Sequence, residues 1–336
     1  MRAMSILAAG GVAGVLLVAC AAPATPDSGK TPVERISALP PVVHPADNPG
    51  SPAKVALGAQ LFVDKRLSGT GNTACQSCHY RHLGWTDGQR FSRRDDQVLN
   101  SRNTPTLYNV GYQTVWYWDG RATTLEGQVT AAWRGQSGAD LARVVALLNS
   151  IPGYATQFQA VFGAPATAES VAKALAAYLR TKISENSPWD RYESGDMNAV
   201  SADAVEGFRL FMGKGRCATC HTPPFYGNST FFNIGLEAGK AKPDPGRFVV
   251  TKNEADTSAF KTPTLRSVAL TAPYFHDGSR ATLIEAVRTM AAGGGDDPKR
   301  STLLVPTGLS EAEIAKVVEF LKSLTSTEAW VAPALP

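Results

Sequence analysis

Apolar residues recur at the spacing of an α-helix in several stretches of this chain, which predicts a mainly α-helical fold. The clearest stretch is 310–324, whose apolar face is formed by Ile314, Val317, Val318 and Leu321. Ser310 and Glu313 form a capping box at its start, a usual signal for a helix N-terminus. The same periodicity predicts further helices over residues 52–65, 139–150, 167–183, 201–213 and 282–292.

Breaks in this pattern divide the chain into two domains. Residues 187–197 separate two groups of predicted helices, so we assign 51–195 to an N-terminal domain and 196–336 to a C-terminal domain. Pro152 and Gly153 are expected to end the helix at 139–150. A polar loop rich in glycine and proline is expected over 225–260.

The N-terminus has the pattern of a secretion signal. Arg2 precedes an apolar stretch at 6–18, which is short for a transmembrane helix. The following LVAC resembles the lipobox of bacterial lipoproteins, which implies a signal peptide over 1–19 and a lipid on the sulfur of Cys20. An ordinary signal peptide, cleaved near residue 22, is the alternative. Residues 20–50 show little periodicity and are expected to form a tether.

The predicted lipid would anchor the protein to a membrane through Cys20. Ala21 follows the cysteine, so the aspartate that retains lipoproteins in the inner membrane is absent at this position. The expected location is therefore the periplasm, at the outer membrane, with membrane contact only through the lipid.

Composition and cysteine usage narrow the class of protein. The 336 residues carry a net charge of +4 without a run of Lys and Arg, so nothing indicates nucleic-acid binding. Of the five cysteines, one is Cys20 and four belong to two short motifs, which leaves none for a disulfide.

The two motifs carry the candidate chemistry. Both read C-x-x-C-H, and their residues are Cys75, Cys78 and His79 in the first and Cys217, Cys220 and His221 in the second. This pattern attaches c-type haem: the thiols bond to the vinyl groups, and the histidine binds iron through a neutral ring nitrogen. C-x-x-C alone also occurs in redox dithiols and zinc sites. Two copies, each followed at once by histidine in a chain with an export signal, favour two covalent haems.

The two halves also match outside these motifs, which predicts an internal duplication of a mono-haem domain. LGAQLFVDKRLSG before the first motif resembles EGFRLFMGKGR before the second. TPTL occurs at 104–107 and at 262–265, and WDG at 118–120 corresponds to HDG at 276–278. Each of these is followed by Arg-Ala, a Thr-Leu pair and a helix. Two haems are then expected to face each other across a pseudo-twofold interface.

The repeat fails at one informative position. With Leu283 set against Leu125, Met290 falls opposite Ala132. A thioether sulfur can be the sixth ligand of haem iron, whereas an alanine side chain cannot bind it. The second half is therefore predicted to hold a His/Met haem, and the first a haem whose distal side is open. Core packing is the alternative role of Met290.

Other candidate axial ligands are less well placed in the sequence. Met197 lies in the linker, and Met212 is expected to pack at the haem edge. His276 is expected to form a local hydrogen bond. None of the remaining histidines is an obvious distal ligand for the first haem, and these are His44, His82 and His276.

Together these motifs resemble the bacterial di-haem cytochrome c peroxidase family, which includes the methylamine-utilisation protein MauG. The resemblance covers about residues 52–325 and rests on both C-x-x-C-H motifs, RNTPTLYNV, WDGRA, FKTPTLRSVALTAPYFHDG and the terminal GLS helix. It implies two cytochrome-c-like α-helical domains with one haem c each. It further implies that the haem held by His79 reacts with peroxide and that the haem held by His221 receives electrons.

The resemblance implies roles for further residues. Met290 falls where the peroxidases place an axial methionine and MauG a tyrosine, which favours a peroxidase. Trp118 matches the family's tryptophan between the haems, where an oxidisable indole can relay electrons; an ordinary buried aromatic is the alternative. Asn103, with the backbone oxygens of Thr271 and Pro273, matches a calcium site, and hard oxygen ligands suit this ion.

Two departures from the family pattern affect the first haem. Residues 91–101 contain no histidine where many members have a distal one, so the haem is expected to be open to peroxide without reductive activation. Gln136 stands where the family has a catalytic glutamate, and an amide cannot be a general acid. Either Gln136 only positions peroxide while water carries the proton, or another acid such as Asp140 substitutes, or peroxide turnover is poor and the biological reaction differs.

Three functions follow from this interpretation. The leading one is a periplasmic peroxidase that reduces hydrogen peroxide to water with electrons from a small cytochrome c or cupredoxin. The second is a MauG-like oxidase that acts on an aromatic residue of a partner protein through a bis-ferryl state. The third is a non-catalytic di-haem electron-transfer protein. A homodimer is a further candidate assembly.

Overall fold

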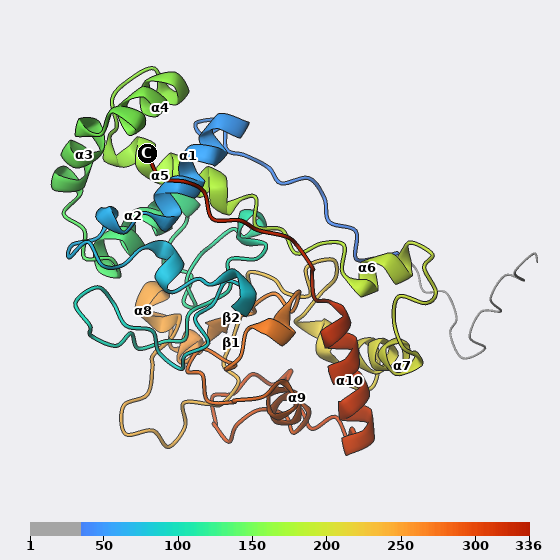
Figure 1. Ribbon diagram of the computed structural model, residues 1–336. Coiled ribbons are helices and arrows are strands. Elements are labelled where there is room, and N and C mark those ends of the chain that lie inside the picture. The colour runs from blue at the N-terminus through green and yellow to red at the C-terminus, as the bar shows by residue number, and fades with distance from the viewer. Residues whose placement is uncertain (1–34) are drawn as a thin grey trace, which may run out of the picture.

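Two helical lobes, one from each half of the chain, lie one above the other (Figure 1). The structure is a computed structural model that describes residues 35–336, so the predicted signal peptide and Cys20 lie outside the described residues. The first lobe contains α1 (Pro52–Val63), α2 (Leu125–Gly135), α3 (Leu141–Ser150), α4 (Pro152–Phe162) and α5 (Ala168–Leu179). The second half contains α6 (Pro188–Glu193), α7 (Ala202–Met212), α8 (Phe248–Thr251), α9 (Leu283–Ala291) and α10 (Glu311–Ser323).

Regular β-structure in the described part is limited to a short antiparallel ladder between β1 (Phe231–Phe232) and β2 (Phe260–Lys261). Between the helices, the long loops carry short 3₁₀ turns at Lys65–Leu67, Cys75–Ser77, Arg81–Leu83, Val110–Tyr112, Cys217–Thr219, Glu254–Asp256 and Val268–Leu270. The mainly α-helical fold class predicted from the sequence is confirmed. In the described residues, 35–336, no helix is both long enough and apolar enough to cross a membrane.

A closely crossed pair of helices forms the centre of each lobe. In the first lobe α1 packs on α5, and a Cβ atom at Gly58 would lie 2.1 Å from the backbone oxygen of Ala174. In the second lobe α7 packs on α10, and a Cβ atom at Gly207 would lie 1.9 Å from the oxygen of Lys316. Any side chain at either glycine would push the helices apart. Both glycines belong to the LGAQLF and EGFRLF segments that resemble each other.

The predicted helices are all present, and the structure adds three, α4, α6 and the short α8 within the predicted loop at 225–260. Thr167, Thr282 and Ser310 cap α5, α9 and α10 through capping boxes. Of these, α4 and α6 both begin with proline in the first turn. Proline favours this position because the first backbone N–H groups of a helix have no intrahelical partner. The Pro152-Gly153 pair therefore starts a helix as well as ending the preceding one.

The linker predicted at 187–197 contains α6, which packs in the second core. The indole of Trp189 contacts the rings of Phe208 and Phe320 at centroid distances of 4.7 and 4.8 Å. Tyr192 is buried in the same cluster. The chain therefore enters the second core before residue 195, the last residue assigned to the first domain.

Residues 35–50, predicted to be part of a tether, are instead bound to both lobes. The backbone N–H of Ser37 donates to Glu193 at 2.9 Å, and its carbonyl accepts from the buried Arg266. Further along, the Asn48 amide donates to Glu126 at 2.7 Å, at the start of α2. Backbone and side-chain polar groups of this segment therefore hydrogen-bond to partners in both lobes.

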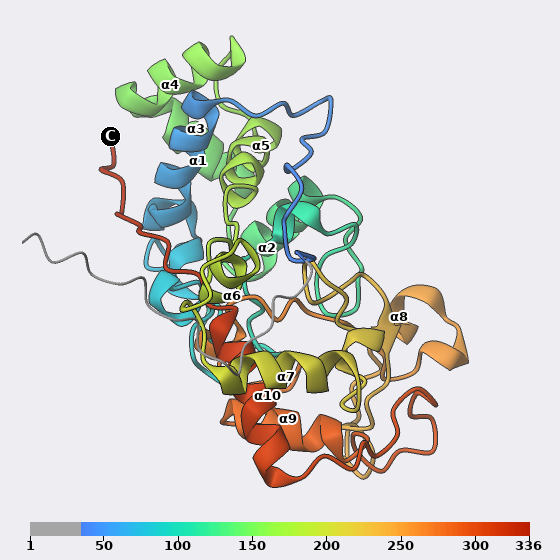
Figure 2. The same cartoon turned by 90° about the vertical axis from the view of Figure 1, so that its right-hand side faces the viewer.

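The C-terminal tail also crosses between the lobes, as the red trace beyond α10 shows (Figures 1 and 2). The indole N–H of Trp330 donates to the Tyr178 hydroxyl at 2.8 Å. Its ring meets that of Trp85 edge-on at 5.6 Å. The last residue, Pro336, accepts a hydrogen bond from Arg66 and lies against α4 at Gly153. The tail thus belongs to the second half by sequence and to the first lobe by packing.

Candidate cofactor sites

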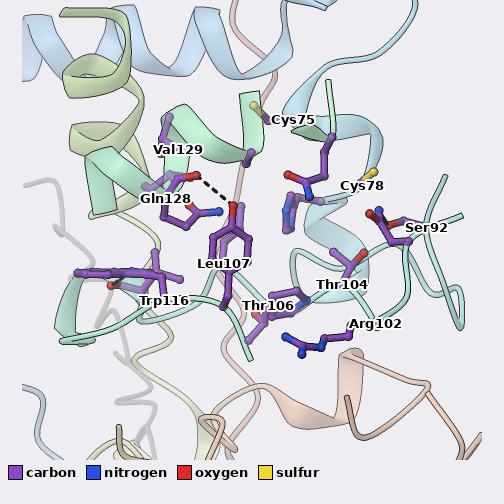
Figure 3. A pocket seen from close by; sticks show the side chains of 18 of the residues that line it. Cys75, Cys78, Ser92, Arg102, Thr104, Thr106, Leu107, Trp116, Gln128 and Val129 are labelled. Atoms are coloured by element: carbon purple, nitrogen blue, oxygen red, sulfur yellow. Dashed lines mark hydrogen bonds between the residues drawn. The ribbon is translucent and has the colours of Figure 1, made fainter. Parts of the chain in front are cut away.

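Each C-x-x-C-H motif lies in the wall of its own cavity. The first cavity, of about 500 Å³, is lined by Cys75, Cys78 and His79. Figure 3 shows these cysteines on one side and residues of α2, including Gln128 and Val129, on the other. The second cavity, of about 230 Å³, is lined by Cys217, Cys220 and His221. Both are enclosed largely by apolar side chains, as cofactor sites usually are.

Both motif histidines have the hydrogen bond expected of an iron ligand. The Nδ1 atom of His79 lies 2.7 Å from the carbonyl oxygen of Trp85, and Nδ1 of His221 lies 3.0 Å from that of Tyr226. A carbonyl oxygen only accepts, so Nδ1 carries the proton and Nε2 keeps its lone pair for a metal. Trp85 and Tyr226 both have positive φ, 61° and 49°, in the turns that aim these carbonyls.

The protonation states of the motif side chains suit covalent haem. Burial lowers the pKa of His79 to about 4, against the opposing effect of the Trp85 carbonyl, and burial also lowers the pKa of His221. Both imidazoles are therefore neutral at pH 7. Burial raises the pKa of Cys75 and Cys217 to about 12, so both are free thiols in the described structure. Neutral imidazole and paired thiols beside a cavity are the donor set that haem c requires, and the residues fit the group.

The two cavities differ in their other candidate ligands. Met290 on α9 lines the second cavity, whereas Ala132 lines the first. Neither rival methionine lines the second cavity: Met197 packs at the edge of the second core, and Met212 is 41% exposed. Met290 is therefore the methionine among these three that lines the second cavity, and the expected packing of Met212 at the haem edge stays a prediction.

Two glutamine side chains of α2 reach the first cavity. Gln136 caps the C-terminus of α2, and its buried Oε1 atom has no hydrogen-bond partner within the described residues. Gln128 lines the same cavity and was not identified from the sequence. The sequence spacing could have identified Gln128, because residues 128, 132 and 136 are spaced by four and therefore lie on one helix face. Once Ala132 is placed toward the haem, Gln128 must follow.

The first cavity offers no uncommitted acid in its described lining. Its carboxylates are Asp95 and Asp119, and Asp119 accepts hydrogen bonds from Arg102 and Arg121. Asp140, considered as a substitute acid, accepts from two backbone N–H groups at the start of α3 and does not line the cavity. Asp140 is therefore a helix cap, which leaves Gln136 without a neighbouring proton donor of the carboxyl type.

Asp95 anchors the loop at 91–101, several residues of which line the first cavity. Its carboxylate accepts from the Thr70 N–H at 2.8 Å and from the hydroxyls of Thr70 and Thr73, both at 2.7 Å. Its own backbone N–H donates to the Gln136 carbonyl at 2.8 Å. Although burial alone would raise it, these hydrogen bonds hold the pKa of Asp95 below its usual value.

We expect Asp95→Asn to lower the free energy of unfolding by about 2–3 kcal/mol at pH 7, because hydrogen bonds to a charged group are lost. The folded-state pKa lies below the unfolded value of about 3.9, so this stabilisation is complete above that pH and disappears as the pH falls through the folded-state pKa. Urea unfolding of both proteins between pH 3 and pH 7 measures it. Asp96→Asn is the control: Asp96 lies on the same loop but is exposed, so this variant should change the free energy of unfolding little. If the two proteins differ in free energy of unfolding by the same amount at pH 7 and at pH 3, the Asp95 carboxylate does not provide this stabilisation.

Trp118 lies in the wall shared by the two cavities, since it lines both. Its indole N–H donates to the Asn103 carbonyl at 2.9 Å, and its own carbonyl accepts from the Lys261 N–H at 2.8 Å. The ring of His276 meets it edge-on at 6.4 Å. These contacts fix the indole between the two cavities, where the relay predicted from the family resemblance requires it.

The three residues of the predicted calcium site also share one cavity wall. Asn103, Thr271 and Pro273 all line the second cavity. The Asn103 amide nitrogen donates to the carbonyl of Gln89 at 2.9 Å, which turns its side-chain oxygen the other way. The predicted donor atoms are oxygens, the kind that calcium prefers, and the calcium site stays a prediction.

His276 takes part in a buried polar cluster that the sequence did not reveal. Its Nε2 atom lies 2.7 Å from Glu237, so the predicted hydrogen bond exists but reaches the distant loop at 225–260. Lys240 binds both Glu237 and Asp277 at 2.6 and 2.8 Å. Phe260 stacks on the imidazole at 3.5 Å. The cluster holds the HDG turn against the second cavity.

The same backbone geometry recurs around both cavities. Trp116 pairs with Ala122 in the first half, and Tyr274 pairs with Arg280 in the second. Between them, Tyr117 and Phe275 have φ values of 67° and 70°. These matched turns lie at corresponding positions of the aligned halves and agree with the interpretation of an internal repeat.

Comparison with known proteins identifies relatives over nearly the whole chain. The profile of the di-haem cytochrome c peroxidases matches residues 52–198, and that of cytochrome c matches 204–325. The cytochrome-c peroxidase IdrP1 of Denitromonas iodatirespirans is 39% identical, over 94% of this chain and 92% of the relative. The methylamine utilization protein MauG of Methylorubrum extorquens is 38% identical, over 99% of this chain and 97% of the relative. The crystal structure of a MauG-like protein associated with microbial copper homeostasis matches with a TM-score of 0.80 at 30% identity, covering 86% of this chain and 94% of that one.

Proposed function

This chain belongs to the di-haem cytochrome c peroxidase family, and on that premise we propose that it reduces hydrogen peroxide to water in the periplasm. The reaction consumes one peroxide, two electrons and two protons and releases two water molecules. A small cytochrome c or a cupredoxin is the proposed electron donor. The location rests on the export and lipobox pattern up to Cys20.

The observation that supports this proposal most strongly is the inequality of the two cavities. The described lining of the first cavity contains His79 but no second histidine and no methionine. The lining of the second contains both His221 and Met290. One iron site would therefore be open to a small reactant, and the other would be filled by two protein ligands. An iron centre with one open position suits peroxide, and a His/Met centre suits electron transfer.

The residues around the sites have distinct proposed roles. Haem held by His79 would supply the redox chemistry toward peroxide. The amides of Gln128 and Gln136 hydrogen-bond and orient the peroxide, but neither can deliver a proton. Water is then the immediate proton carrier in the first cavity. Trp118 passes electrons between the two sites, and a calcium ion held by Asn103, Thr271 and Pro273 stabilises the interface.

A MauG-like oxidation of a partner protein's aromatic residue is the second candidate function. The amide of Gln136 in place of an acid favours it, because slow proton delivery disfavours rapid peroxide turnover. A non-catalytic electron-transfer protein is disfavoured by the open first cavity.

We expect the ferric protein to show one high-spin and one low-spin haem by electron paramagnetic resonance. We also expect its spectrum to respond to peroxide without prior reduction, and reduced cytochrome c to be oxidised on adding peroxide. Stopped-flow spectroscopy of the wild-type protein, with peroxide alone and then with donor, separates these steps. Two low-spin haems would eliminate the open site. A fast response to peroxide combined with no oxidation of small donors would favour the oxidase.

A further inference from the structure

Lys261 is a buried cation in the wall between the two cavities. It lies on β2, is 9% exposed, and lines both cavities. Its backbone N–H donates to the Trp118 carbonyl at 2.8 Å. Although it belongs to the second half, its ammonium group donates to the side-chain oxygen of Gln113 in the first half. The second half thus contributes a positive charge to the first cavity.

This cation has no carboxylate partner among residues 35–336. Lys261 forms no ion pair within that range, and its side-chain hydrogen bond goes to the neutral amide of Gln113. Arg102, another cation that lines the first cavity, does have carboxylate partners: it binds Asp119 and Asp244, both at 2.7 Å. Burial lowers the pKa of Lys261 to about 8, so at pH 7 it is still mostly protonated. An unpaired buried charge is strongly unfavourable, so a compensating anion is expected.

We propose that Lys261 binds a propionate carboxylate of the haem in the first cavity. Haem carries two propionates, which are the anions that this cofactor brings into an otherwise apolar cavity. Gln113, which holds the ammonium group, lines the first cavity and not the second. The charged end of Lys261 is therefore on the side of the first cavity. The proposal rests on haem being bound there, and not on which oxidation reaction follows.

The pairing has a functional consequence for the first haem. A fixed positive charge beside the cofactor favours the reduced iron, which carries one positive charge fewer, so it raises the reduction potential. The charge comes from the residue whose peptide N–H also holds Trp118. The second half would thereby adjust both the first haem and the relay that serves it.

The test uses the holoprotein with Lys261→Met, which keeps an unbranched side chain of similar size without the charge, and Lys261→Arg, which preserves the charge. Spectroelectrochemical titration measures both reduction potentials, and resonance Raman spectroscopy measures the propionate bending bands. We expect Lys261→Met to lower the reduced-to-oxidised ratio of the first haem about tenfold at fixed potential, equivalent to about 59 mV, and to shift its propionate bands. Lys261→Arg should keep the ratio within about threefold.

Lys182→Met is the matched control. Lys182 is another buried lysine, but it lies over the rings of Trp85 and Tyr178 and does not line the first cavity. It should leave the propionate bands unchanged. If the propionate bands of Lys261→Met are unchanged, the proposal is overturned. If only the propionate bands of the second haem change, the assignment of Lys261 to the haem of the first cavity is overturned.

Gln113→Leu tests the pairing if Lys261→Met does not accumulate. Removing the amide leaves the carboxylate as the remaining partner of the ammonium group, so the bands should shift toward stronger hydrogen bonding. No shift would again overturn the pairing. All these spectra are recorded without peroxide, so their failure is distinct from failure of the proposed peroxidase activity.

Discussion

Met290→Ala is expected to convert the second haem from a low-spin His/Met centre to a high-spin centre. Met290 on α9 lines the second cavity, and its sulfur is the thioether placed there. Losing a sulfur ligand lowers the reduction potential, because thioether stabilises the reduced iron. Axial ligands set haem potentials over a range of about 0.8 V, and we expect a fall on the order of 0.2 V here. Electron transfer from the donor should slow in proportion, while the first haem still reacts with peroxide.

Electron paramagnetic resonance of the ferric variant, with a potentiometric titration, measures this change. Met212→Ala is the matched control, since Met212 lies on α7 just before the second motif but is 41% exposed and does not line the cavity. It should leave both spectra and potentials unaltered. If Met290→Ala retains the low-spin signal of the wild type, Met290 is not an iron ligand and only packs in the core.

Gln136→Glu is expected to accelerate the reaction with peroxide by about 10²–10³-fold, since general acid catalysis typically contributes 10²–10⁴-fold. The new carboxyl would occupy the position of an amide whose oxygen is buried and unpaired in the described structure. Burial disfavours the ionised form, and the C-terminus of α2 adds a negative partial charge beside it. Both effects raise the pKa of the introduced acid, so it would be protonated near neutral pH and able to donate.

The rate of the spectral response to peroxide, measured by stopped flow from pH 5 to pH 9, tests this expectation. The gain should be present at low pH and vanish as the pH rises through the pKa of the introduced acid. Gln128→Glu places a carboxyl two turns earlier on the same helix face and serves as the control for charge alone. Equal acceleration by both variants, or none by Gln136→Glu, would show that a missing acid at position 136 does not limit the reaction.

Much of the fold was predictable because helices of this length are encoded locally. The capping pairs and apolar faces predicted α5, α9 and α10 to within a few residues. Two of the missed helices, α4 and α6, begin at Pro152 and Pro188. Pro152 was interpreted only as the end of the preceding helix, although proline also favours the first turn of the next one. Residues 35–50 were misassigned because their order depends on distant partners such as Glu126 and Glu193.

The cofactor-binding residues that are adjacent in sequence could be predicted from the sequence. The motif cysteines and histidines lie together in sequence, and the failed repeat at position 132 pointed to Met290. Lys261 could not be found this way, since its importance lies in lacking a carboxylate partner in the folded chain. The same holds for Glu237, whose bond to His276 joins two loops far apart in sequence.

The C-terminal tail has a consequence for how the molecule is assembled. Trp330 packs edge-on against Trp85, whose carbonyl holds the proximal His79, and it lies beyond every helix of the second half in the sequence. The support of the first haem ligand therefore depends on a segment that follows the second half in the sequence. A fragment that ends between the lobes would carry an intact first motif but a bare indole behind it. The first half on its own thus lacks part of the packing behind its haem ligand.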